Sequence, residues 1–283
     1  MPSHERIDPT ERAHLRDAEG YSPPIFRFAP SEAMADAVRR YWMPVWSMPD
    51  GAATVQRVLQ YPVCLIVIEK SYALLVGPTT GLSTRELTGS GWALGTMLQP
   101  AAGSLLLDGP LTELVDQAVP LETVPGLAGA ALVESVRAVV GDQPEDGVRQ
   151  QVAIAAVEKA LAGLLPVDDE GLLVNMIVEY VESESDVVRV GQVCTRFDLS
   201  ERSLQRLAAK RIGLSPKWLI QRRRLHEAAE LLAAAGPLDL AGVAAGLGYA
   251  DQAHFTRDFR TVTGLTPGAY AAEPRNAPGQ GGG

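Results

Sequence analysis

The 283-residue chain has little cysteine, few histidines and no long apolar run. Its two cysteines, Cys64 and Cys194, lie far apart in the sequence, which is the spacing of neither a disulfide framework nor a metal site and fits a reducing compartment. The densest apolar run, residues 63–68, is much shorter than the ~18 residues that a membrane span requires. The first residues are polar and do not resemble a signal peptide. These absences lead us to expect a cytoplasmic protein without a membrane partner.

Sequence motifs of several enzyme classes are also absent. The chain has no Walker loop, no Ser/His/Asp set of a hydrolase and no His-x-His pair of a metal-binding cupin. The acidic residues 168–170 are interpreted as the negative charge that a helix N-terminus favours, and the alternative is a metal or acid/base cluster. We therefore expect neither an enzyme nor a cofactor or metal.

Charge is distributed unevenly along the chain. The whole chain carries a net charge of −9, which by itself argues against a nucleic-acid partner. Residues 1–186 hold 12 Lys and Arg against 26 Asp and Glu, a net charge of −14, whereas residues 187–283 hold 13 against 8, a net charge of +5. We interpret the acidic part as a separate body and the basic part as the region where a polyanion docks.

The first half of the chain has the pattern of an antiparallel β-domain. Residues 1–30 are polar and broken by prolines, which predicts a flexible lead-in, and Ser31 with Glu32 predicts a short helix that extends to Tyr41. From residue 44 to 124, β-branched and apolar runs alternate with Gly and Pro, as in a small barrel or sandwich. The expected strands are 54–60, 63–69, 72–76, 82–87 and 92–98.

After Pro125 the apolar period becomes helical. We expect one helix at 127–140, a second at 148–165, and a third from 169 to 182 that is followed by a linker at 183–186. The apolar face predicted for the second helix consists of Val148, Val152, Ala155, Val157, Leu161 and Leu164. This face either packs on the β-domain or forms a dimer interface.

The most informative feature is a unit that recurs 51 positions later in the chain. The first copy is marked by Ser200, Leu204, Arg206, Gly213, Leu214 and Pro216. The second copy is marked by Asp251, Phe255, Arg257, Gly264, Leu265 and Pro267. A duplicated unit with a basic residue at a fixed place indicates a surface that is presented twice. A helical polymer with a repeat of its own, namely DNA, is the partner that needs such a surface.

Each copy predicts two short helices joined by a tight turn. The first helices are expected at 190–197 and 240–247, and the second helices are capped by Ser200 and Asp251. A glycine stops each second helix, and a proline then restarts a helix. Each second helix has an apolar inner face and a polar, basic outer face, which describes a helix-turn-helix.

A long amphipathic helix, residues 216–235, is expected between the copies. Arg222, Arg223 and Arg224 are predicted to form a dense positive spot on it, and His226 is interpreted as a residue of the helix face. His254 lies within the helix that Asp251 caps, where proximity to DNA and a packing role are both open.

The residues of the second copy carry a family resemblance. Residues 247–259 read Leu-Gly-Tyr-Ala-Asp-Gln-Ala-His-Phe-Thr-Arg-Asp-Phe, and an Arg-Leu-x-x-Ala pattern begins at Arg224. With these motifs, residues 189–272 resemble the DNA-binding domain of AraC/XylS-family transcriptional regulators. Residues 31–124 more weakly resemble the β-rich effector domain of such regulators. Ala208 departs from the pattern, because the family usually has an aromatic residue there.

The resemblance implies two recognition helices that enter successive major-groove segments on one face of the duplex, roughly 34 Å apart. Base contacts are implied for Arg202, Gln205 and Arg206 in the first segment and for Gln252, Ala253, Thr256 and Arg257 in the second. Phosphate contacts are implied for Lys210, Lys217, Arg222 and Arg260. The plainer alternative is that any one of these side chains is only a solvated group on a helix face.

Aromatic residues of the β-domain are candidates for an effector pocket. They are Trp42, Trp46, Tyr61, Tyr72 and Trp92, and the alternative for each is an ordinary core position. Both cysteines are interpreted as core residues, because free cysteine behaves as a small buried hydrophobe.

We therefore expect an α+β protein. A β-rich, barrel or cupin-like domain with packed helices precedes an all-α domain of two helix-turn-helix units joined by a long helix. The expected ranges are a lead-in at 1–30, a sensor or dimerisation domain at 31–168, a helix and linker at 169–186, a DNA-binding domain at 187–273 and a disordered tail at 274–283.

The expected function is that of a transcriptional regulator that is not an enzyme and needs no cofactor. Its expected partners are double-stranded DNA, a small-molecule effector, a second copy of the chain, and RNA polymerase if it acts as an activator. Two alternatives are open. One is a cysteine-based DNA alkyl-transfer or damage-response protein, which requires an exposed reactive thiol. The other is a ligand-independent DNA-binding scaffold.

Overall fold

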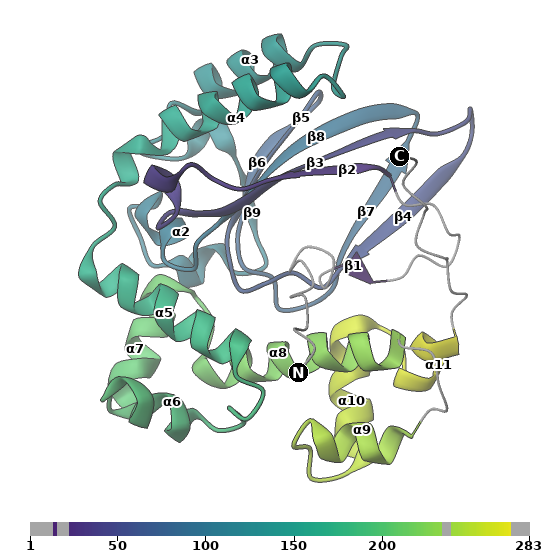
Figure 1. Ribbon diagram of the computed structural model, residues 1–283, viewed down its shortest axis with the longest axis vertical. Helices are drawn as coiled ribbons and strands as arrows, with labels where there is room; N and C mark the ends of the chain where they lie inside the picture. The colour runs from purple at the N-terminus through teal and green to yellow at the C-terminus, as the bar shows by residue number, and fades with distance from the viewer. Residues whose placement is uncertain (1–13, 16–22, 234–238, 273–283) are drawn as a thin grey trace, which may run out of the picture.

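The computed structural model describes residues 14–15, 23–233 and 239–272. They form a β-rich N-terminal part followed by an all-helical C-terminal part, which confirms the predicted α+β class (Figure 1). The predicted tail at 274–283 and most of the predicted lead-in lie outside the described residues, as do the last two residues of the predicted joining helix. None of the described helices is both long enough and apolar enough to cross a membrane.

The β-rich part contains two antiparallel sheets. The larger sheet has the strand order β2-β3-β8-β5-β6-β9 and the smaller sheet the order β1-β4-β7. The strands are β1 His14–Leu15, β2 Ile25–Phe28, β3 Val38–Ser47, β4 Ala53–Val58, β5 Leu65–Glu69, β6 Ala73–Val76, β7 Ser83–Thr88, β8 Ser90–Leu98 and β9 Ala118–Pro120. The five predicted strands between residues 54 and 98 correspond to β4 through β8.

Alternation along the strands places the main core on one face of the larger sheet. In β3, Tyr41, Met43 and Val45 point into this core, which α3 (Gly129–Val140) and α4 (Gly147–Leu161) cover. The residues between them point toward the smaller sheet. Apolar side chains on that second face form two smaller clusters rather than one continuous core.

The predicted helix from Ser31 to Tyr41 is wrong. Only a 3-10 turn, η1 (Glu32–Met34), forms before the chain enters β3 at Val38. The residues after Ser31 favour a helix, but Val38 and Tyr41 are fully buried in the core of the sheet. β-branched and aromatic side chains pack well on a half-buried sheet, and this packing overrides local propensity. The prediction of a flexible lead-in is also wrong for β2, which pairs with β3.

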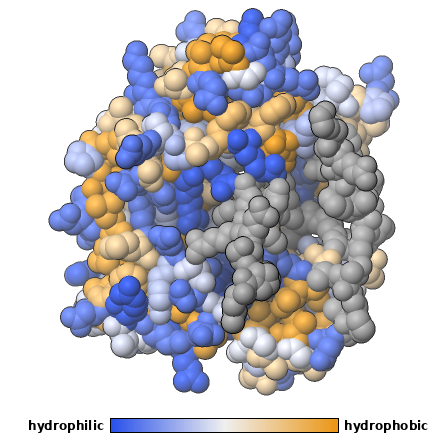
Figure 2. Space-filling model, in the orientation of Figure 1, coloured by the Kyte–Doolittle hydropathy of each residue, from blue (hydrophilic) through white to orange (hydrophobic). Residues whose placement is uncertain are grey.

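The predicted inner face of α4 is wrong at three positions, one of which is the exposed Ala155. Val148 and Val152 are 74% and 48% exposed. The residues that α4 buries are Gln150, Ala153, Ile154, Val157 and Leu161. Apolar residues occur on more than one side of this helix, so the periodicity alone does not select the buried side. Apolar side chains accordingly lie at the surface over the α3–α4 pair (Figure 2).

The helical part begins with α5 (Asp169–Ser183), whose first turn is capped by the Asp168 carboxylate. The first helix-turn-helix unit is α6 (Val190–Phe197) with α7 (Glu201–Arg211), and the second is α9 (Leu240–Gly246) with α10 (Gln252–Thr263). The helix α8 (Pro216–Ala233) lies between them (Figure 1). Shorter elements are α2 Ala102–Leu105, η2 Leu111–Leu114, η3 Leu121–Thr123, η4 Ala162–Leu164 and α11 Pro267–Ala272.

Each helix-turn-helix unit has its own hydrophobic cluster. The first cluster joins α6 and α7 to α5 and the start of α8. The second is built on Phe255 and Phe259 of α10, whose ring centroids are 5.8 Å apart, and on Tyr270 of α11. Leu59, in the loop after β4, is also fully buried in this second cluster. The β-domain therefore supplies part of the packing of the second unit.

Candidate nucleic-acid interface and ligand cavity

The recognition helix of the first unit, α7, is held by the predicted cap and glycine. Ser200 Oγ accepts a hydrogen bond from the Ser203 N–H at 3.1 Å, and Gly213 adopts a φ of 81° after the helix. The outward side chains predicted to contact bases are Arg202, Gln205 and Arg206, and all three are exposed. Their spacing of three and four residues places them on one helix face.

The recognition helix of the second unit, α10, repeats this construction. Asp251 Oδ1 accepts a hydrogen bond from the His254 N–H at 2.7 Å, and Gly264 adopts a φ of 76°. The outer side of the helix borders a shallow depression. Its lining residues are Gln252, Ala253, Thr256, Arg257, Arg260, Thr261 and Thr266. The five residues predicted to contact DNA in this unit thus lie around one concave surface.

His254 has packing partners within its own unit. Its imidazole makes an edge contact with the Tyr249 ring, with centroids 5.3 Å apart, and its Nε2 lies 3.5 Å from Asp258 Oδ2. These contacts favour the packing role among the two roles left open by the sequence.

The predicted phosphate-contacting lysines differ in their surroundings. Lys217 is exposed at the start of α8. Lys210 is also exposed, but its Nζ donates to Glu170 Oε1 at 2.6 Å. Any phosphate contact of Lys210 therefore competes with this ion pair to α5.

The predicted positive spot on α8 is not a surface feature, because Arg222 and Arg223 are buried. Arg222 Nη2 donates to the carbonyl oxygens of Thr79 and Gly81 at 2.6 and 3.1 Å, and the guanidinium lies over the Trp218 ring. Burial lowers the pKa of Arg222 to about 9. The phosphate contact predicted for Arg222 is therefore wrong in this arrangement, where the residue joins α8 to the β-domain.

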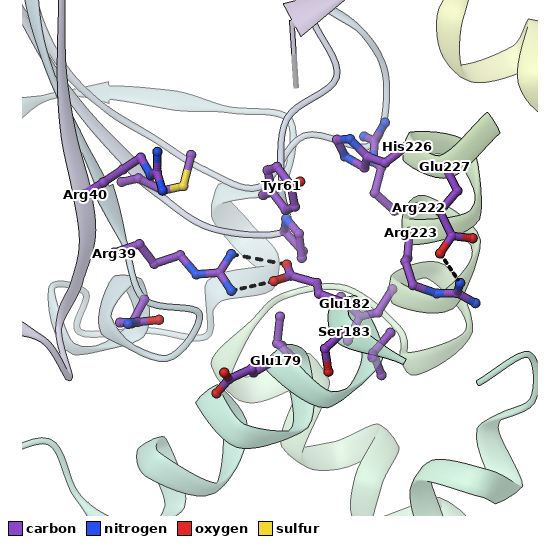
Figure 3. Close-up of a pocket in the computed structure, with 16 residues that line it drawn as sticks. Arg39, Arg40, Tyr61, Glu179, Glu182, Ser183, Arg222, Arg223, His226 and Glu227 are labelled. Carbon is purple, nitrogen blue, oxygen red and sulfur yellow. Dashed lines mark hydrogen bonds and ion pairs between the residues drawn. The ribbon is translucent and has the colours of Figure 1, made fainter. Parts of the chain in front are cut away.

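The junction between the β-domain and the helices contains a cavity of 520 Å³ (Figure 3). Arg39 of β3 makes a two-point ion pair with Glu182 of α5, with N–O distances of 3.2 and 2.5 Å. His226, predicted to lie on an open helix face, is instead buried beside Tyr61. The sequence of α8 alone carries no signal for this burial, because the β-domain covers that side of the helix.

A second cavity, of 310 Å³, lies between the two sheets of the β-domain. Four of the five predicted effector residues line it, namely Trp42, Trp46, Tyr61 and Tyr72. Trp92 does not, because it lies on the opposite face of β8 and is buried in the main core. The prediction for Trp92 is therefore wrong.

Sequence reasoning missed most of the other residues that line this cavity. They include Val58, Gln60, Leu65, Val67, Glu69, Leu74, Arg85 and Met97. Alternation along β5 and β6 was the available signal, since every second residue of a strand shares a face. The sequence did not reveal which of the two faces lies under the smaller sheet.

The two cysteines are buried to different degrees. Cys64 is 1% exposed, and burial raises the pKa of its thiol to about 12. Cys194 is half-buried against the hydrophobic cluster of the first unit. Among the residues that the structure describes, no group of three or more His, Cys, Asp or Glu side chains is placed to hold a metal ion.

Two families match separate parts of the chain. Residues 193–273 match a family described as a helix-turn-helix domain, and residues 26–120 match a domain of unknown function, DUF6597. The residues between the two matches include α3, α4 and α5. Both parts of the chain thus match a family, but only the family that matches the C-terminal part is described by a type of domain.

The chain is similar to YfiF of Bacillus subtilis (strain 168), described as an uncharacterized HTH-type transcriptional regulator. The two are 29% identical over 99 residues, which is 35% of this chain and 31% of YfiF. The matched region therefore spans less than a third of the length of this relative.

Solved structures show similarity over longer stretches. ToxT from Vibrio cholerae is 14% identical with a TM-score of 0.40, and the match covers 88% of this chain and 97% of ToxT. The C-terminal domain of AraT, a response regulator from Geobacillus stearothermophilus, is 25% identical with a TM-score of 0.34, over 39% of this chain and 92% of that domain. The family match and the duplicated capped helices together show that the C-terminal part of this chain is an AraC-type helix-turn-helix domain, and this part is similar to a relative described as an HTH-type transcriptional regulator.

Proposed function

We propose that this chain binds specific DNA through α7 and α10, which enter successive segments of the major groove. The observation that carries the proposal is the matched exposure of the two helices. Each presents an arginine at the same place in the repeat, Arg206 in the first unit and Arg257 in the second, and both side chains are exposed. An exposed arginine on a recognition helix is suited to the paired acceptors O6 and N7 of guanine.

The test is a gel-shift titration at fixed salt, with a DNA duplex selected by the wild-type protein from a random pool. Arg206→Ala and Arg257→Ala are each expected to weaken binding by about 1–3 kcal/mol and to relax base preference at one position of the site. The two positions should lie one helical turn of DNA apart, since the units read successive segments. Equal affinity of the wild type and both variants would overturn the assignment.

Two matched variants control for charge. Lys159→Ala removes one exposed positive charge from α4, outside the DNA-binding part, and is expected to leave affinity unchanged. Lys217→Ala is expected to weaken binding to all sequences alike and to lower the slope of log K against log salt by about 1. This difference separates base contacts from phosphate contacts.

We also propose that a small molecule binds in the cavity between the two sheets and shifts the disposition of the β-domain and the helical part. The support is that Tyr61 belongs to the lining of this cavity and also to that of the junction cavity against α8. A ligand that raises the melting temperature and also changes operator affinity supports this step. We further propose that the chain forms a homodimer and, if it acts as an activator, that it contacts RNA polymerase.

A further inference from the structure

The cavity between the sheets is lined by residues whose chemistry restricts what it binds. On the larger sheet, every second side chain of a strand points into the cavity, so that β5 contributes Leu65, Val67 and Glu69. Apolar side chains on this face pack into two clusters, one around Tyr61 and Leu65 and the other around Trp46 and Leu87. The cavity is lined by residues of both clusters, which do not join into one continuous core.

Two tryptophans lie flat on the sheet because their cross-strand partners are glycines. Trp42 pairs with Gly95, and Trp46 pairs with Gly91. A Cβ added at Gly95 would lie 2.2 Å from the ring of Trp42, and one at Gly91 would lie 2.4 Å from the ring of Trp46. The indole rings thus cover β8 instead of filling the space above it. Trp42 is only half-buried, which leaves part of its ring for a ligand.

Charge in the cavity is balanced. Among the described lining residues, Glu69 and Arg85 are the charged ones. The Glu69 carboxylate accepts hydrogen bonds from the Tyr72 hydroxyl and from Arg85 Nη2, the latter at 3.3 Å. The Arg85 guanidinium also lies over the Tyr72 ring, 4.5 Å from its centroid. A cationic ligand would compete with Arg85 for the Glu69 carboxylate. An anionic ligand would compete with that carboxylate for Arg85 and would be repelled by it.

We propose that this cavity binds an uncharged, largely apolar ring compound. The ligand lies against the indole of Trp42, and its one hydrogen-bonding group lies at the end formed by Glu69, Tyr72 and Arg85. A volume of 310 Å³ is at the lower end of the range of small-molecule sites, about 300–1,000 Å³, which favours a compact ligand of one or two fused rings. This inference rests on the proposed function and specifies the chemical class of its effector.

The test uses three indoles that carry a small neutral, cationic or anionic substituent at the same ring position. They are 3-methylindole, the cation of 3-(aminomethyl)indole and the anion indole-3-carboxylate. Isothermal titration calorimetry on the full chain should give one site for 3-methylindole and an affinity about tenfold or more above that of either charged compound, because a buried charge without a partner is costly. Equal affinities of the three, or no saturable binding of any, would overturn the proposal.

Variants locate the site. Gly95→Ala should lower the affinity for 3-methylindole about tenfold, because the added Cβ displaces Trp42. Gly163→Ala, where a Cβ meets nothing within 4 Å, should leave it unchanged. If Gly95→Ala fails to fold, as judged by circular dichroism, Trp42→Ala replaces it. Unchanged affinity in the variant used would show that the compound binds elsewhere and overturn the proposal.

Arg85→Ala provides a specificity switch. The variant leaves the Glu69 carboxylate without its guanidinium partner, so the affinity for the aminomethyl cation should rise about tenfold while that for 3-methylindole changes little. An unchanged affinity for the aminomethyl cation in this variant would overturn the proposed place of the polar group.

Operator binding separates this inference from the proposed function. Binding of 3-methylindole with no effect on operator affinity supports the ligand class and contradicts the effector role. An operator response to a charged or sugar-like compound at this cavity, with no binding of 3-methylindole, overturns the ligand class and leaves the proposed function standing.

Discussion

The phenol ring of Tyr61 is stacked on the imidazole of His226, with ring centroids 4.5 Å apart and an angle of 20° between the planes. Tyr61 lies in the loop between β4 and β5, and His226 lies in the middle of α8 (Figure 3). Since Tyr61 also lines the cavity between the sheets, this stack is a direct contact between the wall of that cavity and the helix that joins the two DNA-binding units.

Removal of this stack should loosen α8 against the β-domain. In Tyr61→Ala, we expect faster hydrogen exchange of the amides in α8 and unchanged exchange in α3 and α4, because local opening depends on local packing. Tyr72→Ala is the control, since Tyr72 lines the same cavity but lies away from the junction. Identical exchange of α8 in both variants would show that the stack does not hold the helix.

The loop that carries Tyr61 also contributes Leu59 to the core of the second unit. Leu59→Ala should lower the free energy of unfolding by roughly 2–5 kcal/mol, because it removes a fully buried side chain and leaves a cavity. Val55→Ala, on the neighbouring strand at 45% exposure, should change it by no more than about 0.5 kcal/mol. Chemical denaturation followed by circular dichroism measures both. A cost at Leu59 as small as that at Val55 would mean that the β-domain does not complete this core.

The two repeat glycines offer a matched comparison. Gly213 and Gly264 both have a positive φ, so alanine at either site should cost about 1–2 kcal/mol in backbone strain. A Cβ at Gly264 meets nothing within 4 Å, whereas one at Gly213 would lie 2.8 Å from Val115 Cγ2 and 3.0 Å from the Leu111 carbonyl oxygen. Gly213→Ala should therefore cost about 1–3 kcal/mol more in a urea titration. Equal costs would argue against close packing of the first unit on the β-domain.

Acid should weaken the attachment of α7 to α5. Hydrogen bonds from Lys210 and Arg211 lower the pKa of Glu170. Partial burial acts to raise the pKa of Asp168, but the hydrogen bond from Gly171 and the pairing with Arg211 outweigh it, so that this pKa is also lowered. The stability that both carboxylates contribute is thus present above about pH 4 and is lost as the pH falls through their folded values.

Arg211→Met tests this linkage. The variant should lose less of its unfolding free energy than the wild type when the pH falls from about 5 to 3, because the carboxyl pKa values move back toward their unfolded values. Denaturation series at several pH values give the two slopes. Parallel slopes would show that Arg211 does not set the titration of these groups.

The helical half could be predicted closely because its signals are local. Ser200 and Asp251 cap helices within one turn, and Gly213 and Gly264 end them, so that sequence neighbours decide the structure. The exposure of Arg206 and Arg257 follows from helical periodicity once these ends are known. The contacts of these arginines with DNA remain a prediction.

The burial of Trp92 and His226 could not be predicted, because it depends on elements distant in sequence. Trp92 is in the core because α3 and α4 cover that face of β8, and His226 is buried because a β-domain loop lies against α8. The burial of Arg222 could not be predicted for the same reason. Its charge suits phosphate contact, but its position on α8 turns it toward Thr79 and Gly81.

The helix α5 has a consequence for how the chain can be divided. Val174, Ile177 and Val178 of α5 are buried in the same cluster as Leu204 of the first recognition helix, whereas the family match begins only at residue 193. A fragment cut to that match would lack α5 and would expose to water the apolar side of α7 that packs on it. A fragment designed to keep the packing of α7 should therefore include α5 and its cap, and so begin before Asp169.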